Sequence, residues 1–298
     1  MKLSEPEIGI GRLCGLFGLS RQAYYSYKKR RVQTYLETDQ VIKMIKSVRS
    51  VHPRMGCRKI YDIIKVDLDM AKIKIGRDKL FDLMSDNELL IRKRRRKAIT
   101  TNSFHSFRRY KNLIQDFIPY QANQLWVSDI TYIRNGEGFM YLFLITDAYS
   151  KKVVGYKLGR TLETKHAIDS LEQALKSAKR IEGLIHHSDR GIQYCSNNYV
   201  KLLQDYNVEI SMTENSDPRE NAIAERVNGI LKDEYIEPLL KRSGLGLSEI
   251  IDTAIYRYNQ LRPHLSCDMK TPAEAHTMKG EIQKRWKNYY RKKPIIIN

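Results

Sequence analysis

Three acidic residues, Asp129, Asp189 and Glu225, have types and surroundings suited to holding a divalent metal ion. Asp129 lies within Leu125–Ile133, an apolar and β-branched stretch typical of a buried strand. A carboxylate is costly to bury without a partner, so its presence there indicates a specific task. Carboxylate oxygens are the ligands that Mg²⁺ takes from proteins, and pairs of such ions serve phosphodiester chemistry. The three residues therefore predict a metal site that acts on phosphodiesters.

Asp189 and Glu225 belong to two further elements that must meet the first strand. Asp189 follows the short apolar run 183–188, so we expect it where a strand ends and a loop begins. Glu225 lies in the segment 217–234, whose initial Asp-Pro pair is typical of a helix start. At 100° per residue, this helix has an apolar face and an opposite polar stripe formed by Asn221, Glu225, Asn228 and Lys232.

The spacing of these residues carries a resemblance to a known family. Asp129 and Asp189 are 60 positions apart, 35 residues separate Asp189 from Glu225, and Lys232 follows seven residues later. This arrangement resembles the Asp, Asp, 35-residue spacer, Glu signature of retroviral integrases and their bacterial insertion-sequence relatives, with the helical lysine of those transposases. Two more blocks resemble the family, 187–196 and the pair 258–264 and 271–274, so that the likeness covers residues 123–276.

The chain is identified as a member of the insertion-sequence transposases, of the second-frame (OrfB) type encoded by two overlapping frames. It departs from the family pattern at Glu220, where many relatives have Asp, and at Arg226, where Ser is common. Neither residue is a candidate metal ligand.

The resemblance implies an activity and its requirements. The expected enzyme is a DDE-type polynucleotidyl transferase, which cuts DNA at the element ends and joins the exposed 3′-OH to another strand. Asp129, Asp189 and Glu225 are the expected catalytic and metal-binding residues, holding two Mg²⁺ ions that Mn²⁺ can replace. The expected partners are DNA, as element ends and target, a homo-multimer on two ends, and an upstream first-frame protein or fusion. DNA contacts are expected within the core at Lys232, Arg190, Asn221 and Asn228.

The charge of the chain is concentrated in its first part. The formal net charge is +19, and residues 1–122 hold 27 Lys and Arg against 12 Asp and Glu. This part is the candidate for binding a polyanion. Acidic lipid, RNA and a merely solvated basic surface are alternatives that charge alone leaves open.

The N-terminal region predicts helices that could reach DNA. Residues 10–29 predict a helix, a turn at Gly18 and a second helix capped by Ser20, a helix-turn-helix outline. In that case the contacts come from the start of the second helix, at Arg21, Gln22 and Tyr24. An ordinary helical hairpin is the alternative. Three further helices are predicted at 38–51, 57–67 and 75–87, and the resemblance adds DNA contacts on them at Arg58 and Lys59, which could equally be solvated charges.

The remaining pattern predicts the domain organisation. The dense basic run around Arg94, Arg95 and Arg96 indicates a connector that touches the DNA backbone or is simply solvated. The predicted segments are a helix-turn-helix-like segment at 1–35, a helical DNA-binding domain at 36–97, a basic and polar linker at 98–122, an integrase-type core at 123–276 and a basic aromatic tail at 277–298.

The core pattern predicts a fold. Strands at 125–133, 139–148 and 153–158 are separated by short turns and are followed by helix 164–178, strand 183–187, helix 197–206, strand 208–212 and the Glu225 helix. The expected class is α/β (α+β). The resemblance implies a ribonuclease-H-like core, a mixed five-stranded sheet with flanking helices, preceded by a small all-helical region.

Several classes of protein are disfavoured. The four cysteines are scattered without a short pair, which disfavours zinc ribbons and disulfide frameworks. No secretory signal and no membrane-spanning apolar run is apparent, so the expected location is the bacterial cytoplasm, in association with the nucleoid. Two competing functions stay open: a non-catalytic DNA-binding regulator derived from a transposase, and a ribonuclease-H-like nuclease that hydrolyses without joining ends.

Overall fold

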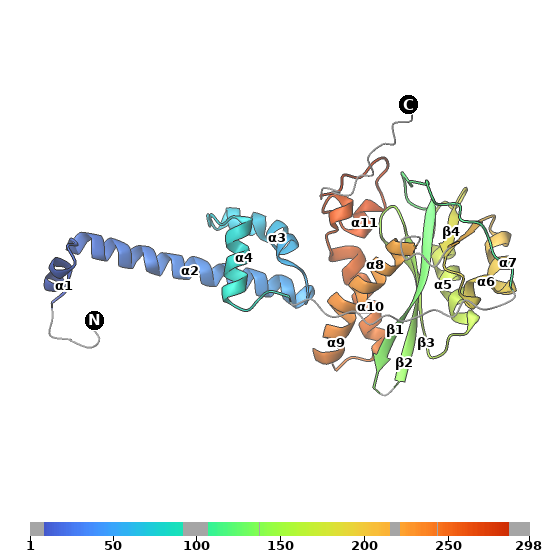
Figure 1. Ribbon diagram of the computed structural model, residues 1–298, viewed down its shortest axis with the longest axis horizontal. Helices are drawn as coiled ribbons and strands as arrows, with labels where there is room; N and C mark the ends of the chain where they lie inside the picture. Colours follow the sequence, from blue (N-terminus) through green and yellow to red (C-terminus); the bar gives the residue numbers. More distant parts are fainter. Residues whose placement is uncertain (1–8, 92–106, 137, 215–220, 243, 286–298) are drawn as a thin grey trace, which may run out of the picture. The chain divides into compact units, whose positions relative to one another are not determined.

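The computed structural model describes residues 9–91, 107–136, 138–214, 221–242 and 244–285. The chain divides into two compact units. The first is helical and lies within the first 92 residues, and the second contains the β-sheet (Figure 1). Each unit has its own hydrophobic core and is described separately.

The first unit contains four helices, α1 (Ile10–Leu16), α2 (Arg21–Val51), α3 (Cys57–Met70) and α4 (Arg77–Asp86). Gly18 has a positive φ of 65°, which ends α1 in a tight turn. Ser20 then caps α2 as predicted, because its Oγ accepts a 3.0 Å hydrogen bond from the Ala23 N–H. None of the helices in the described ranges is both long enough and apolar enough to cross a membrane.

Helix α2 is a single helix where the sequence predicted two. Residues 20–51 contain no glycine or proline, so nothing interrupts the helical hydrogen bonds. Its C-terminal half packs Val41 and Ile45 against α3 and α4, through residues such as Ile60 and Leu80. Its N-terminal half is exposed. The domain boundary predicted between residues 35 and 36 thus falls inside α2.

The second unit is built on a five-stranded mixed sheet with the order β3-β2-β1-β4-β5. The strands are β1 (Leu125–Asn135), β2 (Gly138–Asp147), β3 (Val153–Gly159), β4 (Ile185–Ser188) and β5 (Glu209–Met212). The first three form an antiparallel meander, and β4 and β5 add in parallel beyond β1. The predicted fold class is confirmed, and β1 lies at the centre of the sheet.

Helices cover both faces of this sheet (Figure 1). Side chains alternate along β2, so that Leu142 and Leu144 join one core while Phe143 and Ile145 join the other. The second core is completed by α5 (Thr164–Ser177) and α7 (Asn197–Asp205), with the short α6 (Ile192–Cys195) between β4 and α7. Gly155 of β3 allows the close approach of α5, because a Cβ there would lie 2.2 Å from the Ser170 carbonyl oxygen.

The opposite face carries the C-terminal helices. These are α8 (Ala222–Ile230), a π-helix (Leu231–Ile236), α9 (Glu237–Arg242), α10 (Leu247–Tyr256), a second π-helix (Arg257–Leu261), a 3₁₀ turn (Leu265–Cys267) and α11 (Pro272–Ala275). The predicted start of the Glu225 helix at residues 217 and 218 lies outside the described residues. Val227, Ile230 and Leu231 pack against Leu142 and Leu144 of the sheet.

Polar side chains of the 258–264 block tie this layer together. Asn259 pairs with the backbone of Val153, donating to its carbonyl at 2.9 Å and accepting from its N–H at 3.0 Å. Arg262 is fully buried and donates to both carboxylate oxygens of Glu234, at 2.8 and 2.9 Å. This block therefore stabilises the core by hydrogen bonding, because it satisfies a strand end and a buried charge.

The described part of the predicted linker, from residue 107, lies against the core. Ile114 and Phe117 pack beside Leu125 and Val127, and the Leu113 N–H donates to Ser211 Oγ at 2.9 Å. The packing of the second unit therefore begins upstream of residue 123.

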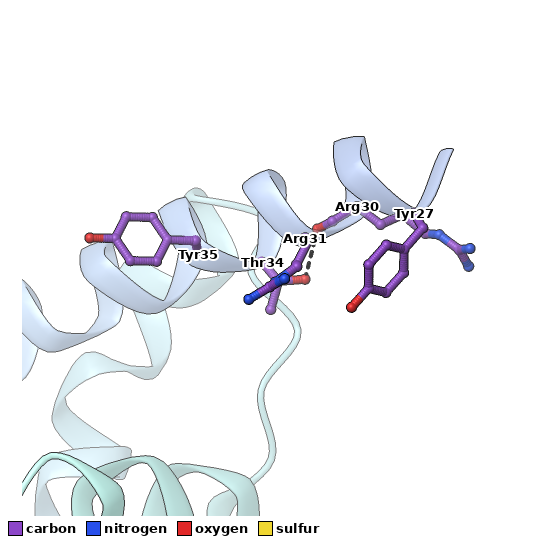
Figure 2. Close-up of a pocket in the computed structure, with 5 residues that line it drawn as sticks. All are labelled: Tyr27, Arg30, Arg31, Thr34 and Tyr35. Atoms are coloured by element: carbon purple, nitrogen blue, oxygen red, sulfur yellow. Dashed lines mark hydrogen bonds between the residues drawn. The ribbon is translucent and has the colours of Figure 1, made fainter. Parts of the chain in front are cut away.

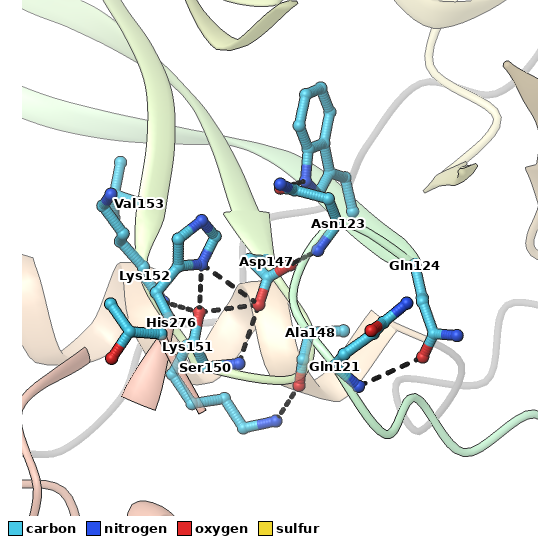
Figure 3. Close-up of polar contacts among 12 residues, drawn as sticks. Gln121, Asn123, Gln124, Asp147, Ala148, Ser150, Lys151, Lys152, Val153 and His276 are labelled. Atoms are coloured by element: carbon cyan, nitrogen blue, oxygen red, sulfur yellow. Dashed lines mark hydrogen bonds and ion pairs between the residues drawn. The ribbon is translucent and has the colours of Figure 1, made fainter. Parts of the chain in front are cut away.

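Asp147, Ser150 and His276 form a polar cluster at the end of β2, in which Asp147 and Ser150 are buried and His276 is half-buried (Figure 3). Ser150 donates to Asp147 through both its N–H (2.7 Å) and its Oγ (2.6 Å), and His276 Nδ1 lies 2.9 Å from Ser150 Oγ. Burial alone would raise the pKa of Asp147, but hydrogen bonds from His276 and Ser150 hold it below its ordinary value. Asp147 and Ser150 are fully buried, so this set of residues joins α11 to the β2–β3 turn and is not reached by substrate.

Candidate active site

Asp129 on β1 and Asp189, directly after β4, lie at neighbouring parallel strands. In the register of β1 and β4, Ser128 pairs with Ser188, and each aspartate is the residue that follows in the chain. Adjacent strands are about 4.8 Å apart, so the two carboxylates share one edge of the sheet. Both side chains are half-buried.

Asp129 is held from two sides. Its Oδ1 accepts from the Ile130 N–H at 2.9 Å, and its Oδ2 accepts from Asn228 Nδ2 at 2.8 Å. Burial, followed by the charge of Asp189 and less strongly that of Glu225, raises the pKa of Asp129 to about 7, although the two hydrogen bonds oppose the rise. A carboxylate in this position is stabilised by a proton or by a cation.

Asp189 is oriented by the loop that follows it. The Gly191 N–H donates to Asp189 Oδ1 at 3.0 Å. A Cβ on Gly191 would lie 2.9 Å from the same oxygen, so a larger residue would displace the carboxylate. Gln193 and Tyr194, further along the loop, are buried, and Gln193 donates to the Leu162 carbonyl at 2.8 Å. They therefore support the loop from inside. Arg190 is half-buried.

Two asparagines fasten α8 to β1. Asn221 Nδ2 donates to the Ser128 carbonyl at 3.0 Å. Asn228 Nδ2 donates to the side chain of Asp129, which is the next residue of β1. Both asparagine side chains are buried, so the polar stripe predicted for this helix partly faces the sheet. Lys232 follows on the same side, where its Nζ donates to the Tyr132 carbonyl at 2.6 Å and burial lowers its pKa.

Glu225 lies between these two anchors but its side chain is exposed. Its charge contributes to the raised pKa of Asp129, so it is within electrostatic reach of the pair. Across the described ranges, no three His, Cys, Asp or Glu side chains lie close enough together to hold one metal ion. The two aspartates are thus brought together, and Glu225 lies on the adjacent helix, outside such a group.

The donor set fits a hard divalent cation. Asp129 and Asp189 offer carboxylate oxygens, and burial together with the charge of Asp189 raises the pKa of Asp129 to about 7. Mg²⁺ needs few protein carboxylates and keeps other positions for water and substrate. The adjacent histidines point to opposite faces of the sheet and so do not share one ion: His186 bonds Ser128 and Tyr199 on one face, and His187 bonds Ser211 on the other.

The remaining sequence-predicted DNA contacts lie in the first unit or beyond the described residues. Arg21, Gln22 and Arg58 are exposed, while Tyr24 and Lys59 are half-buried. The basic run of Arg94, Arg95 and Arg96 and most of the 277–298 tail lie outside the described residues. The Asn228 bond to Asp129 was not predicted from the sequence, although the position of Asn228 on the Glu225 stripe was the available signal.

Comparisons with known proteins agree with this arrangement. The Integrase core domain family matches residues 119–218, and a second family of the same description matches residues 206–272. The chain is 31% identical over 265 residues to the uncharacterized 31 kDa protein of insertion element IS600 from Shigella sonnei, covering 88% of this chain and 96% of that protein. It is also 31% identical over 242 residues to the transposase for insertion sequence element IS629 from Shigella sonnei, covering 79% and 80%.

Among solved structures, the HTLV-2 integrase catalytic core domain in complex with magnesium aligns with a TM-score of 0.44 and 22% identity, covering 52% of this chain and 97% of that one. The IS600 protein matches nearly from end to end, and the integrase core families match the segments that contain all three acids. The chain therefore belongs to the insertion-sequence transposases with an integrase-type, ribonuclease-H-like core.

Proposed function

We propose that this transposase catalyses Mg²⁺-dependent DNA strand cleavage and strand transfer at the ends of its element, with Asp129, Asp189 and Glu225 as its catalytic triad. The observation that carries the proposal is the pair of aspartates, one on β1 and one directly after the adjacent β4, with the Glu225 helix hydrogen-bonded to the first. Two steps use the same site. Water attacks a phosphodiester and releases a 3′-OH, and that hydroxyl then attacks a second phosphodiester in line, displacing its 3′ oxygen.

The residues of the site have separate tasks in this proposal. Asp129 and Asp189 hold the metal ions, and Glu225, whose exposed side chain is free of the packing that fixes its neighbours, turns inward to complete the set. Two Mg²⁺ ions, or Mn²⁺ in their place, would supply positive charge to the phosphate oxygens and activate the attacking hydroxyl. Asn228 keeps the Asp129 carboxylate aimed at the site, because its amide occupies Oδ2 on the helix side.

DNA must lie across this edge of the sheet. We assign Lys232, Arg190 and the neighbouring asparagines Asn221 and Asn228 to the approach of the strand, with Lys232 closest to the backbone near the scissile end. The same proposal includes element ends and target DNA as substrates, a homo-multimer that brings two ends together, and an upstream first-frame protein or fusion. Its place of action is the nucleoid.

The test uses duplex DNA carrying the inverted repeats that flank the coding region. The parent chain with Mg²⁺ should cleave the end and produce joined strands. Asp189→Asn should reduce both products by at least about 100-fold, since a metal-bound site contributes several kcal/mol to the transition state. Asp205→Asn, an exposed acid at the end of α7, is the matched control and should act like the parent.

Three results would contradict the proposal. If Asp189→Asn joined DNA strands at the parental rate, the proposed metal site would not be required for the reaction. Cleavage by the parent without any joined product would indicate a nuclease. Binding without cleavage, with Mg²⁺ and Mn²⁺ both supplied, would indicate a regulator.

A further inference from the structure

The N-terminal half of α2 has a one-sided charge. Between residues 20 and 36 the sequence holds five basic residues and no acidic residue. This half of the helix is exposed, apart from the half-buried Tyr24, whereas the following half is packed into the first unit. A helix that buries almost nothing over four turns, and carries only positive charge, is suited to a polyanionic partner.

Five residues of this half line a shallow hollow of about 460 Å³, shown in Figure 2. They are spaced at i, i+3, i+4, i+7 and i+8, so they share one face of the helix. We call this the α2 basic face, made of Tyr27, Arg30, Arg31, Thr34 and Tyr35. The two tyrosines at its ends are 56% and 72% exposed, which leaves their hydroxyls available to a ligand.

The charges of the α2 basic face are not neutralised by neighbouring acids. No carboxylate in the described part of the chain forms an ion pair with Arg30 or Arg31. The nearest acids along the helix are already engaged, since Glu37 accepts from Gln33 at 2.8 Å and Asp39 pairs with Lys43 at 2.7 Å. The positive face is therefore left for an external group.

The side-chain types favour phosphate over a second copy of the chain. Two such helices side by side would bring ten positive charges together, and the face offers no continuous apolar seam of the kind that helix pairing needs. Guanidinium, tyrosine and threonine groups are instead the donors that most often contact phosphate oxygens. Nine residues of helix span about 12 Å, which corresponds to about three phosphates along one DNA strand.

We propose that the α2 basic face binds the phosphate backbone of duplex DNA without reading its sequence. It holds the DNA through Arg30 and Arg31, with Tyr27, Thr34 and Tyr35 donating from their hydroxyls. This surface follows the Arg21 end of the helix, where the sequence predicted base contacts, and it belongs to the first unit, whereas Asp129 and Asp189 belong to the second. The inference rests on the proposed function only in taking DNA as the polyanion.

The experiment measures the affinity of the full-length chain for duplex DNA of random sequence, without divalent metal, over a series of salt concentrations. Each phosphate contact contributes about −0.9 to the slope of log K against log salt, so Arg30→Gln/Arg31→Gln should make the slope shallower by about 1.8. At 0.1 M salt, affinity should fall by roughly eightfold for each lost contact. The charge-preserving Arg30→Lys/Arg31→Lys should keep a slope near that of the parent.

Controls separate this surface from general charge and from catalysis. Lys46→Gln/Lys79→Gln removes two exposed charges elsewhere in the first unit and should change the slope by less than half as much. Because no divalent metal is present, the slope is measured without cleavage, whether or not the proposed strand transfer is correct. An unchanged slope in Arg30→Gln/Arg31→Gln would overturn the inference, as would an equal effect of the lysine control. A change confined to self-association in the absence of DNA would assign the face to a second copy instead.

Discussion

At the scale of single residues, the site depends on how one carboxylate is surrounded. Asp129 is half-buried, close to Asp189, and hydrogen-bonded by Asn228, and its pKa rises to about 7 because burial and the neighbouring charge outweigh those bonds. Near neutral pH, ionisation of Asp129 therefore destabilises the metal-free folded protein, and a bound cation would remove this destabilisation. The residue is destabilising by itself, which is a common property of functional sites.

This leads to a prediction about stability and pH in the absence of metal. The folded-state pKa of Asp129, about 7, lies above the ordinary aspartate value of 3.8, so the proton stabilises the fold in acid and that contribution is lost as the pH rises through about 7. Asp129→Asn should therefore be more stable than the parent at pH 8, by about 1–3 kcal/mol, and the difference should shrink towards pH 5. Thermal unfolding in EDTA at both pH values measures it. An equal difference at the two pH values would contradict the assigned cause.

At the scale of elements, the site is positioned by two close contacts with the sheet. The asparagines of α8 bond β1 on either side of Glu225, and on the opposite face α5 lies directly on β3. Gly155 is required for the second contact, because a Cβ there would meet the Ser170 carbonyl oxygen at 2.2 Å and the Ala174 Cβ at 2.9 Å. A displaced α5 would disturb the strands that carry the acids.

We therefore expect opposite effects from two glycine substitutions. Gly155→Ala should destabilise the second unit by about 1–3 kcal/mol, because backbone must move to admit the methyl group. Gly229→Ala, within α8, meets no atom within 4 Å and should stabilise by about 0.5–1 kcal/mol, because alanine is the better helix former. Chemical denaturation followed by circular dichroism compares the two. Destabilisation of similar size in both variants would show that the Gly155 contact is not the cause.

At the scale of the whole molecule, the chain is two units with separate cores and unequal charge. The first unit is centred on α2 residues such as Ile45, and the second on the sheet and its two helical layers. Most of the net positive charge belongs to residues 1–122, whereas Asp129, Asp189 and Glu225 follow this region in the sequence. Under the proposed function, holding DNA and cutting it are largely assigned to different parts of the chain.

Separate cores predict separate unfolding transitions in calorimetry. Ile45→Ala removes a fully buried side chain from the first unit. It should lower the unfolding temperature of that unit, because it reduces the stability of the unit by about 2–5 kcal/mol. Glu234→Gln leaves the buried Arg262 without its counter-charge. It should lower the unfolding temperature of the second unit, because it reduces the stability of that unit by about 3 kcal/mol. Glu172→Gln breaks an exposed pair with Lys176 and should change neither by more than about 0.5 kcal/mol. A single transition shifted by both buried variants would contradict two independent cores.

The order of strands and helices in the core could be predicted from the sequence, because the apolar periodicity is local and strong there. The proximity of Asp129 and Asp189 was expected from the fold that the family resemblance implied, and the register of β1 and β4 places each acid directly after the pair Ser128 and Ser188. The cap at Ser20 and the turn at Gly18 were also local signals that the structure bears out. The division of the first 97 residues into two domains stays a prediction. The boundary predicted between residues 35 and 36 falls inside the continuous helix α2.

The sequence by itself determined the types and spacing of the acids, the strand order that aligns two of them, and the concentration of positive charge near the N-terminus. Only the tertiary structure decided that Asn228 holds Asp129, that Glu225 stays exposed beside the pair, and that Ser150 and the half-buried His276 gather around the buried Asp147. Asn228 and Asp129 are 99 positions apart in the chain, and His276 and Ser150 are 126 positions apart. Local periodicity reports which face of an element is apolar, whereas the partner of a polar side chain depends on how whole elements pack.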